Sequence, residues 1–152
     1  MNTVYPVHFT YKTQTASITL SSSVEAELRE KLCYQTVEQG GALGIENGVI
    51  SHYYHDTQAK FDCNLFQPSP LLNVLLVVWK QEGIAFAGLI HSHPEDWPEL
   101  SEGDLDYVRK LLLANPQLPA VLMGIMAGDQ LLFYGFERDF LTASQTHRET
   151  VR

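Results

Sequence analysis

The chain has 152 residues, of which 45% are hydrophobic, and its formal net charge is −8. Its length and apolar content predict a single globular domain (1–152) with a buried core, and they exclude a disordered chain. A negative charge without a basic run argues against nucleic-acid binding. No apolar run reaches the roughly 20 residues of a membrane-spanning helix. Because the N-terminus also lacks the features of a signal peptide, we expect a cytoplasmic protein.

The N-terminal half shows mostly strand-like patterns around one amphipathic helix. A capping-box pattern, Ser22-Ser-Val-Glu25, precedes apolar residues at helical spacing and predicts a helix that runs to about Glu38 and ends before a glycine pair. Asn47-Gly48 is typical of a type I′ turn and predicts a hairpin. The predicted elements are, in chain order, strands at 4–11 and 16–20, a helix at 22–38, a hairpin of strands 42–46 and 49–55, and a strand at 61–66.

The C-terminal half contains two predicted helices and three predicted strands. Residues 71–81 are apolar nearly all round, which predicts a buried helix, and the apolar run 84–90 is typical of a central strand. Further elements are a helix at 101–115 and a hairpin of strands 120–127 and 130–137; the tail 138–152 is left unassigned. Together the segments predict an α/β fold, in which a mixed β-sheet is sandwiched by helices.

A histidine pair follows directly on the predicted central strand. His91 and His93 are two residues apart, so their side chains lie on one side of an extended segment. Seven residues separate His93 from Ser101, and Asp104 lies three positions further on. Two imidazoles and a carboxylate can bind zinc and leave a fourth position open for water, as in catalytic zinc sites. His91, His93 and Asp104 are therefore the predicted metal ligands.

This spacing, H-x-H-x7-S-x-x-D, resembles the JAMM motif of the JAB/MPN (Mov34-type) metalloprotease family. The family motif also has an upstream glutamate before a glycine-rich stretch, and Glu38 stands before Gly40-Gly41 here. The resemblance spans about residues 20–136. It implies an α/β/α fold similar to that of cytidine deaminases and one Zn²⁺ per chain. It also implies that Glu38 is the general base and that Ser101 stabilises the oxyanion.

The same resemblance implies a function. Zinc-activated water would hydrolyse the amide bond after the C-terminal tail of a ubiquitin or ubiquitin-like protein, as in deconjugation or precursor processing. Segment 61–66 is the predicted edge to which that tail adds as a strand. Short stand-alone members of the family are associated with ubiquitin-like conjugation, some in antiviral defence, or with sulfur-carrier processing. The alternatives are a small peptidase for another peptide or a sulfur-carrier substrate, and a catalytically silent scaffold.

Each candidate site residue also has a purely structural interpretation. Ser101 can be a helix N-cap alone, and Asp104 can complete a capping box with it, which would compete with metal binding. Glu38 can be a solvated residue at a helix C-terminus, although the helix dipole disfavours an acid there. The other glutamates considered for the general base are Glu46, Glu95 and Glu99.

The remaining histidines and the cysteines do not match this site. His52 and His55 are three residues apart on a predicted strand, so they lie on opposite faces and are interpreted as surface or packing residues. Trp97 is expected either to line a substrate groove or to anchor its loop. Cys33 and Cys63 lack zinc-ligand spacing and are expected to remain reduced.

Overall fold

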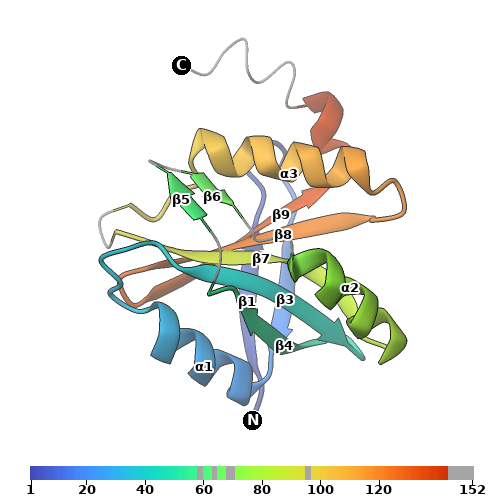
Figure 1. The fold of residues 1–152 in the computed structure, drawn as a ribbon. Coiled ribbons are helices and arrows are strands. Elements are labelled where there is room, and N and C mark those ends of the chain that lie inside the picture. The colour runs from blue at the N-terminus through green and yellow to red at the C-terminus, as the bar shows by residue number, and fades with distance from the viewer. Residues whose placement is uncertain (58–59, 63–64, 68–70, 95–96, 144–152) are drawn as a thin grey trace.

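The computed structural model describes residues 1–57, 60–62, 65–67, 71–94 and 97–143 (Figure 1). Most predicted elements are present within a few residues of their expected limits. They are, in chain order, β1 (Thr3–His8), β2 (Ala16–Leu20), α1 (Ser22–Leu32), β3 (Gly40–Glu46), β4 (Val49–His55), β5 (Lys60–Asp62), β6 (Leu65–Gln67), α2 (Leu71–Gln81), β7 (Ala85–His93), α3 (Glu102–Ala114), β8 (Ala120–Ala127) and β9 (Gln130–Glu137).

Seven strands form one mixed sheet in the order β1-β2-β4-β3-β7-β8-β9. Strand β7 lies inside this order and pairs antiparallel with β3 and parallel with β8. The sheet closes on itself because β1 pairs in parallel with β9 through Val7 and His8. The predicted mixed α/β class is confirmed, but the predicted sandwich is not, because the sheet is a closed barrel.

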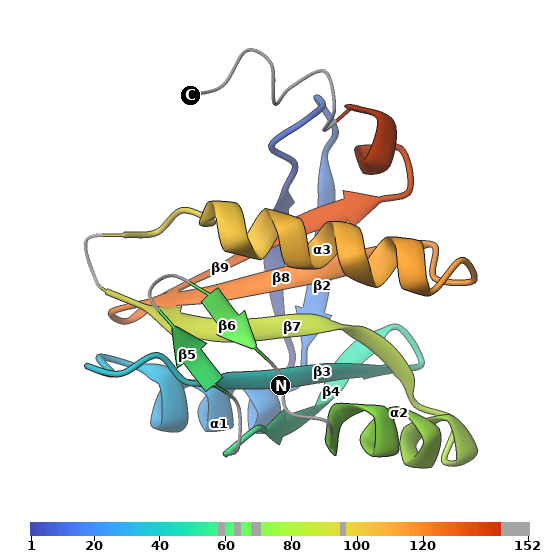
Figure 2. The same ribbon diagram turned by 45° about the horizontal axis from the view of Figure 1, so that its top comes forward.

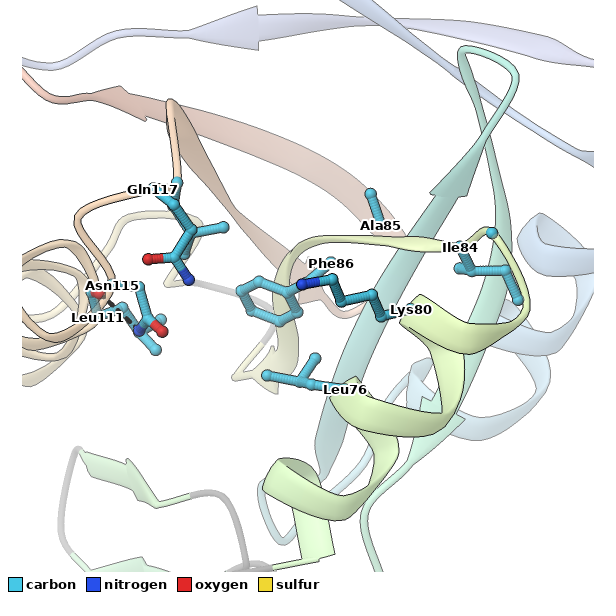
Figure 3. A pocket seen from close by; sticks show the side chains of 10 residues that line it. Leu76, Lys80, Ile84, Ala85, Phe86, Leu111, Asn115 and Gln117 are labelled. Atoms are coloured by element: carbon cyan, nitrogen blue, oxygen red, sulfur yellow. Dashed lines mark hydrogen bonds between the residues drawn. The ribbon is translucent and has the colours of Figure 1, made fainter.

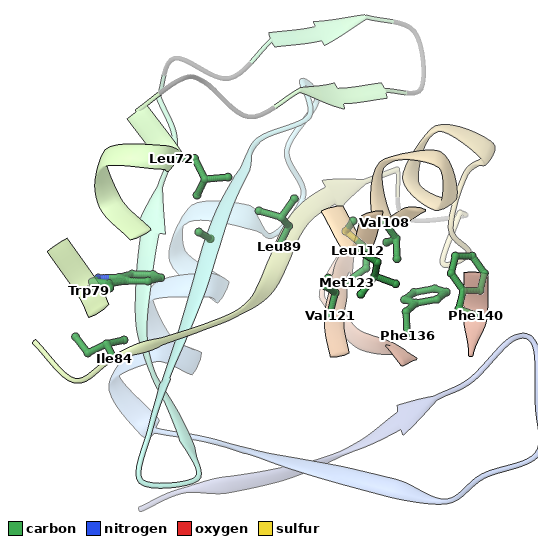
Figure 4. Close-up of a cluster of buried hydrophobic side chains, with 11 residues drawn as sticks. Leu72, Trp79, Ile84, Leu89, Val108, Leu112, Val121, Met123, Phe136 and Phe140 are labelled. Atoms are coloured by element: carbon green, nitrogen blue, oxygen red, sulfur yellow. The ribbon is translucent and has the colours of Figure 1, made fainter. Parts of the chain in front are cut away.

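The helices lie on two faces of this sheet and bury two separate clusters (Figures 1 and 2). Neighbouring residues of β7 point to opposite faces: Leu89 belongs to the cluster under α2 and α3, and Ile90 to the cluster under α1. Figure 4 shows the first cluster: Ala42, Leu72, Trp79, Ile84, Leu89, Val108, Leu112, Val121, Met123, Phe136 and Phe140. The second contains Leu20, Val24, Leu28, Leu32, Leu43, Ile50, Ile90, Met126, Leu131 and Phe133.

Helix α1 is shorter than predicted. It ends at Leu32, and Cys33 already has an extended backbone with ψ of 132°. Tyr34 then has a positive φ of 54°, and its N–H donates to Gly128 O in the β8–β9 turn at 3.1 Å. This long-range hydrogen bond takes the chain out of helical geometry. Glu38 consequently lies in an irregular connection before β3, so the argument from the helix dipole does not apply to it.

Helix α2 is not buried all round as its sequence predicts. Leu72 and Trp79 face the core, whereas Val74, Val77 and Val78 are 61%, 59% and 43% exposed. One side of the helix packs on the sheet and the other faces outward. Within the described ranges, no helix combines the length and apolar character that crossing a membrane requires.

The predicted strand at 61–66 is instead two short strands. β5 and β6 pair antiparallel as a separate two-stranded sheet, with Phe61 opposite Phe66. β6 contacts α3, and Figure 2 shows the pair in front of the half of β7 that leads to the histidines. The first part of the unassigned tail is also structured: Phe140 is buried, and Arg138 donates to Leu112 O and Leu118 O near the end of α3.

Candidate metal centre

Strand β7 carries His91 and His93 to the face of the sheet that α3 covers. They are two and four residues after Leu89 on this strand, so they point to the same side as Leu89, which packs in the cluster under α2 and α3. Both side chains are almost fully buried, with 0% and 4% of each residue exposed. Ser92, between them, points to the opposite face. The predicted orientation of the histidine pair is therefore present in the structure.

Asp104 meets this pair from the first turn of α3. It lies one and two turns before Val108 and Leu112, so the buried stripe of the helix places it toward the sheet. Its Oδ1 is 2.7 Å from His91 Nε2 and its Oδ2 is 3.5 Å from His93 Nε2. The structure thus brings together the three side chains that the sequence suggests as metal ligands.

The capping box at the start of α3 does not compete with this arrangement. Asp104 N–H donates to Ser101 Oγ at 3.1 Å, and Ser101 N–H donates to Asp104 Oδ2 at 3.0 Å. Oδ1 meanwhile faces His91. The Asp104 carboxylate therefore completes the capping box with Oδ2 and still directs Oδ1 at His91 Nε2.

Backbone carbonyls orient both imidazole rings. His93 Nδ1 lies 3.1 Å from Trp97 O, so an Nδ1–H donor leaves Nε2 directed at Asp104. His91 Nδ1 lies 3.3 Å from Ser92 O, again with Nε2 on the Asp104 side. Metal-binding histidines usually donate their second ring N–H in this way, which holds the ring in place.

Glu38 completes the cluster from the connection before β3. Its carboxylate and the ring nitrogens of His91 and His93 offer ligand atoms that all lie within 4.8 Å of one another. Among the described residues, Glu38 Oε2 is the one buried side-chain oxygen or nitrogen without a hydrogen-bond partner. A buried carboxylate oxygen without a partner is costly. This oxygen and the imidazole and carboxylate donors together fit a metal site.

The charges in the cluster are strongly coupled. Burial alone would raise the pKa of Asp104, but its hydrogen bonds to His91 and His93 hold that pKa well below its usual range. Burial alone would lower the pKa of His91, but the hydrogen bond and charge of Asp104 outweigh it, and the pKa is raised. Burial raises the pKa of Glu38, while the neighbouring histidines oppose the rise. The contacts between Asp104 and the two imidazoles therefore oppose the shifts in pKa that burial alone would cause.

Gly40 allows β3 to approach β7 at this site. It pairs with His91 across the two strands. A Cβ at Gly40 would lie 2.2 Å from Ile90 O and 2.7 Å from His91 Cβ, which no real packing tolerates. Gly40, two residues after Glu38, is thus required by the close contact between β3 and the strand that carries the histidines.

Other candidate residues lie outside the cluster. Glu46 is at the far end of β3 from His91, Glu99 is exposed, and Glu95 and Cys63 lie outside the described residues. His52 hydrogen-bonds Ser51 and packs against Trp79, in agreement with a packing role. The Trp97 side chain is 54% exposed, so it does not anchor the loop by burial; its backbone carbonyl does contact the site.

The sequence reasoning missed Ser92 and Gln39. Gln39 N–H donates to Ser92 Oγ at 2.9 Å, and Ser92 N–H donates to Gln39 O at 2.7 Å. These bonds tie the segment that carries Glu38 to the strand that carries both histidines. The alternation of β7 places Ser92 opposite the histidines, but its partner depends on the path of a distant loop.

The structure also has a cavity of about 390 Å³ between the ends of α2 and α3. Its walls include Leu76, Phe86 and Leu111, and the polar ends of Lys80 and Gln117 point toward the Phe86 ring (Figure 3). Phe86 is at the start of β7 and the histidines are at its end. This cavity is therefore a different place from the histidine cluster.

Comparisons with known proteins show resemblance at the level of the fold. No family model and no curated protein matches the chain. A solution structure of a Desulfitobacterium hafniense protein is similar, with a TM-score of 0.50, 19% identity, and coverage of 79% of this chain and 84% of the other. For a Salinibacter ruber protein the values are 0.47, 17%, 79% and 82%. For a JAB1/MPN domain protein of Archaeoglobus fulgidus they are 0.38, 14%, 76% and 80%.

Proposed function

We propose that this protein is a zinc-dependent (iso)peptidase that cleaves the amide bond after the C-terminal tail of a ubiquitin or ubiquitin-like protein. The observation that carries the proposal is the convergence of His91, His93, Asp104 and Glu38, whose buried Oε2 has no hydrogen-bond partner. The motif spacing in the sequence supports the same chemistry.

His91, His93 and Asp104 would hold the metal, because their ligand atoms face one another and their second polar atoms are already bonded elsewhere. A bound zinc ion would supply Lewis acidity, which lowers the pKa of a water molecule and polarises a carbonyl. Asp104 stays ionised, as a metal ligand must, because its pKa is held low.

Glu38 would take the proton from the attacking water and return it to the leaving amine. Its raised pKa suits this task, since a general base works best when its pKa approaches the working pH. The Ser101 hydroxyl would donate to the oxyanion while it accepts the Asp104 N–H, since a hydroxyl can do both.

An extended tail would add to β5 or β6 as a further strand, with Trp97 as an exposed aromatic contact near its path. β6 lies beside α3, the helix whose first turn carries Asp104, and a tail added there would be directed toward the cluster. A flexible tail of small residues suits a site whose histidines are this deeply buried.

The test is the metal content and cleavage activity of the parent protein and of His91→Ala and Glu38→Ala. The substrate is a ubiquitin-like protein fused through its C-terminal tail to a reporter. We expect about one zinc per chain in the parent and in Glu38→Ala, none in His91→Ala, and activity in the parent alone. His52→Ala is the matched control and should keep both metal and activity.

A parent protein without metal would contradict the metal centre and favour a silent scaffold. Metal with cleavage of short peptides but not of the fusion would favour the small-peptidase alternative. Full activity in Glu38→Ala would remove Glu38 as the base.

A further inference from the structure

The general base proposed above lies on a segment that regular secondary structure does not hold. Residues 33–39 form an irregular connection between α1 and β3, so ladder hydrogen bonds do not fix Glu38. A catalytic base must nevertheless be held to within a fraction of an ångström, because a misplacement of about 1 Å can cost a hundredfold in rate. The bonds of its neighbour, Gln39, are therefore of interest.

Every polar group of Gln39 has a partner. The backbone N–H and C=O pair with Ser92 at 2.9 and 2.7 Å. In the side chain, Oε1 lies 3.1 Å from His55 Nε2, and Nε2 donates to Gln35 Oε1 at 2.9 Å. Gln39 is thus bonded both to the histidine strand β7 and to the end of β4.

The bonds of Gln39 set the tautomer of His55. Because Gln39 Oε1 is an acceptor, His55 Nε2 carries the proton and donates to it. His55 Nδ1 then accepts from the Tyr53 hydroxyl at 2.7 Å. The chain of hydrogen bonds runs in one direction: Tyr53 O–H to His55, His55 N–H to Gln39, and Gln39 N–H to Gln35. It requires a neutral ring, and burial, together with the charge of Lys31, lowers the pKa of His55.

We propose that Gln39 and His55 are positioning residues for Glu38: the hydrogen bond between their side chains, with the clamp of Ser92 on the Gln39 backbone, holds the base against the histidine pair. The proposal rests on the proposed function for the role of Glu38. It gives His55 a function that its sequence position does not suggest. On the same strand, the His52 ring nitrogen bonds Ser51 instead, which makes His52 a suitable control.

The experiment compares His55→Leu, His55→Gln, Gln39→Leu and the control His52→Leu in the full chain. The first readout is amide hydrogen exchange across residues 35–40 of the metal-free protein, which does not depend on activity. We expect exchange to be about tenfold faster in His55→Leu and Gln39→Leu, and unchanged in His52→Leu. His55→Gln keeps an N–H donor near the position of Nε2 and should restore most of the protection.

The second readout separates kcat from KM in the cleavage assay. His55→Leu should lower kcat about tenfold while KM and zinc content stay at parent values, and Gln39→Leu combined with it should add little. In a Glu38→Asp background, whose shorter base is already misplaced, the loss caused by His55→Leu should shrink. A merely structural role predicts the same loss in both backgrounds.

Unchanged exchange in both His55→Leu and Gln39→Leu would overturn the proposal. So would a loss of kcat of the same size in the parent and in the Glu38→Asp background. A parent protein that cleaves no fusion would contradict the isopeptidase function alone, and the exchange comparison would still decide whether His55 holds the Glu38 segment.

Discussion

The two ends of β7 differ in what fills the space beside them. At the C-terminal end, Glu38 and Asp104 both lie close to His91 and His93, and Asp104 and both histidines are almost fully buried. At the N-terminal end, a cavity of about 390 Å³ is bounded mainly by apolar side chains, with Lys80 among the polar residues that line it. Buried ionisable groups are costly unless they are paired. A cluster of them is therefore a stronger indication of a functional site than an apolar cavity is.

The glycines near the two ends of β7 also differ in their surroundings: one is tightly packed and the other has open space beside it. Gly40 is in contact with His91 and Ile90, whereas Gly83, just before β7, has open space where a Cβ would stand. At Gly83 the backbone φ of +80° disfavours any other residue. At Gly40 the neighbouring atoms leave no space for a Cβ. Substitutions at the two ends should therefore have separable effects on stability and on metal binding.

The largest effect is expected from Gly40→Ala. Its Cβ would overlap Ile90 O and His91 Cβ, so β3 and β7 must separate, at a cost of about 3 kcal/mol or more in the free energy of unfolding, and metal binding should be lost. Gly83→Ala should cost only about 1–2 kcal/mol, the strain of a left-handed residue, and should keep the metal. Chemical denaturation and metal analysis of the two variants check these predictions. Equal losses of stability and of metal in the two variants would contradict the proposed difference between the two ends of β7.

A smaller effect is expected from Ile84→Ala at the cavity end. Ile84 is 6% exposed and packs in the cluster with Trp79. Its truncation should cost about 2–3 kcal/mol, in the lower part of the usual range because an open cavity already adjoins it. Metal content should remain at the parent value. Loss of metal in this variant would show that the two ends are coupled through β7.

The smallest effect is expected away from both ends, at Glu25 on α1. Its pKa is lowered, chiefly by the hydrogen bond from Tyr5, with Thr3 and Arg29 adding to the shift. A lowered pKa in the folded state means that the contribution is present above the unfolded pKa of about 4.3 and is lost as the pH falls through the folded value. After allowance for solvent screening, Glu25→Gln should cost about 0.5 kcal/mol at pH 7.

Denaturation curves of the parent and Glu25→Gln at several pH values check this prediction. The difference between them should be constant from about pH 6 to 8 and should shrink below about pH 4. A difference that grows in acid would show that the sign is wrong. Metal content should be the same in both proteins near neutral pH.

The sequence by itself determined most of the strands, most of the helices and the candidate ligands on β7 and α3, because these depend on local spacing. Alternation along β7 is enough to place His91 and His93 on one face, and helical spacing is enough to place Asp104 in line with Val108 and Leu112. These periodicities are properties of a single strand or helix. They do not require knowledge of which elements become neighbours.

The tertiary structure decided the features that depend on distant partners. Helix α1 ends at Leu32 because Tyr34 bonds Gly128, and this places Glu38 in a connection rather than in a helix. The sheet closes because β1 meets β9, the strand furthest from it in the sheet order. Gln39 finds Ser92 and His55 on two different strands. In each case the deciding contact joins residues far apart in the chain, and local pattern carries no information about it.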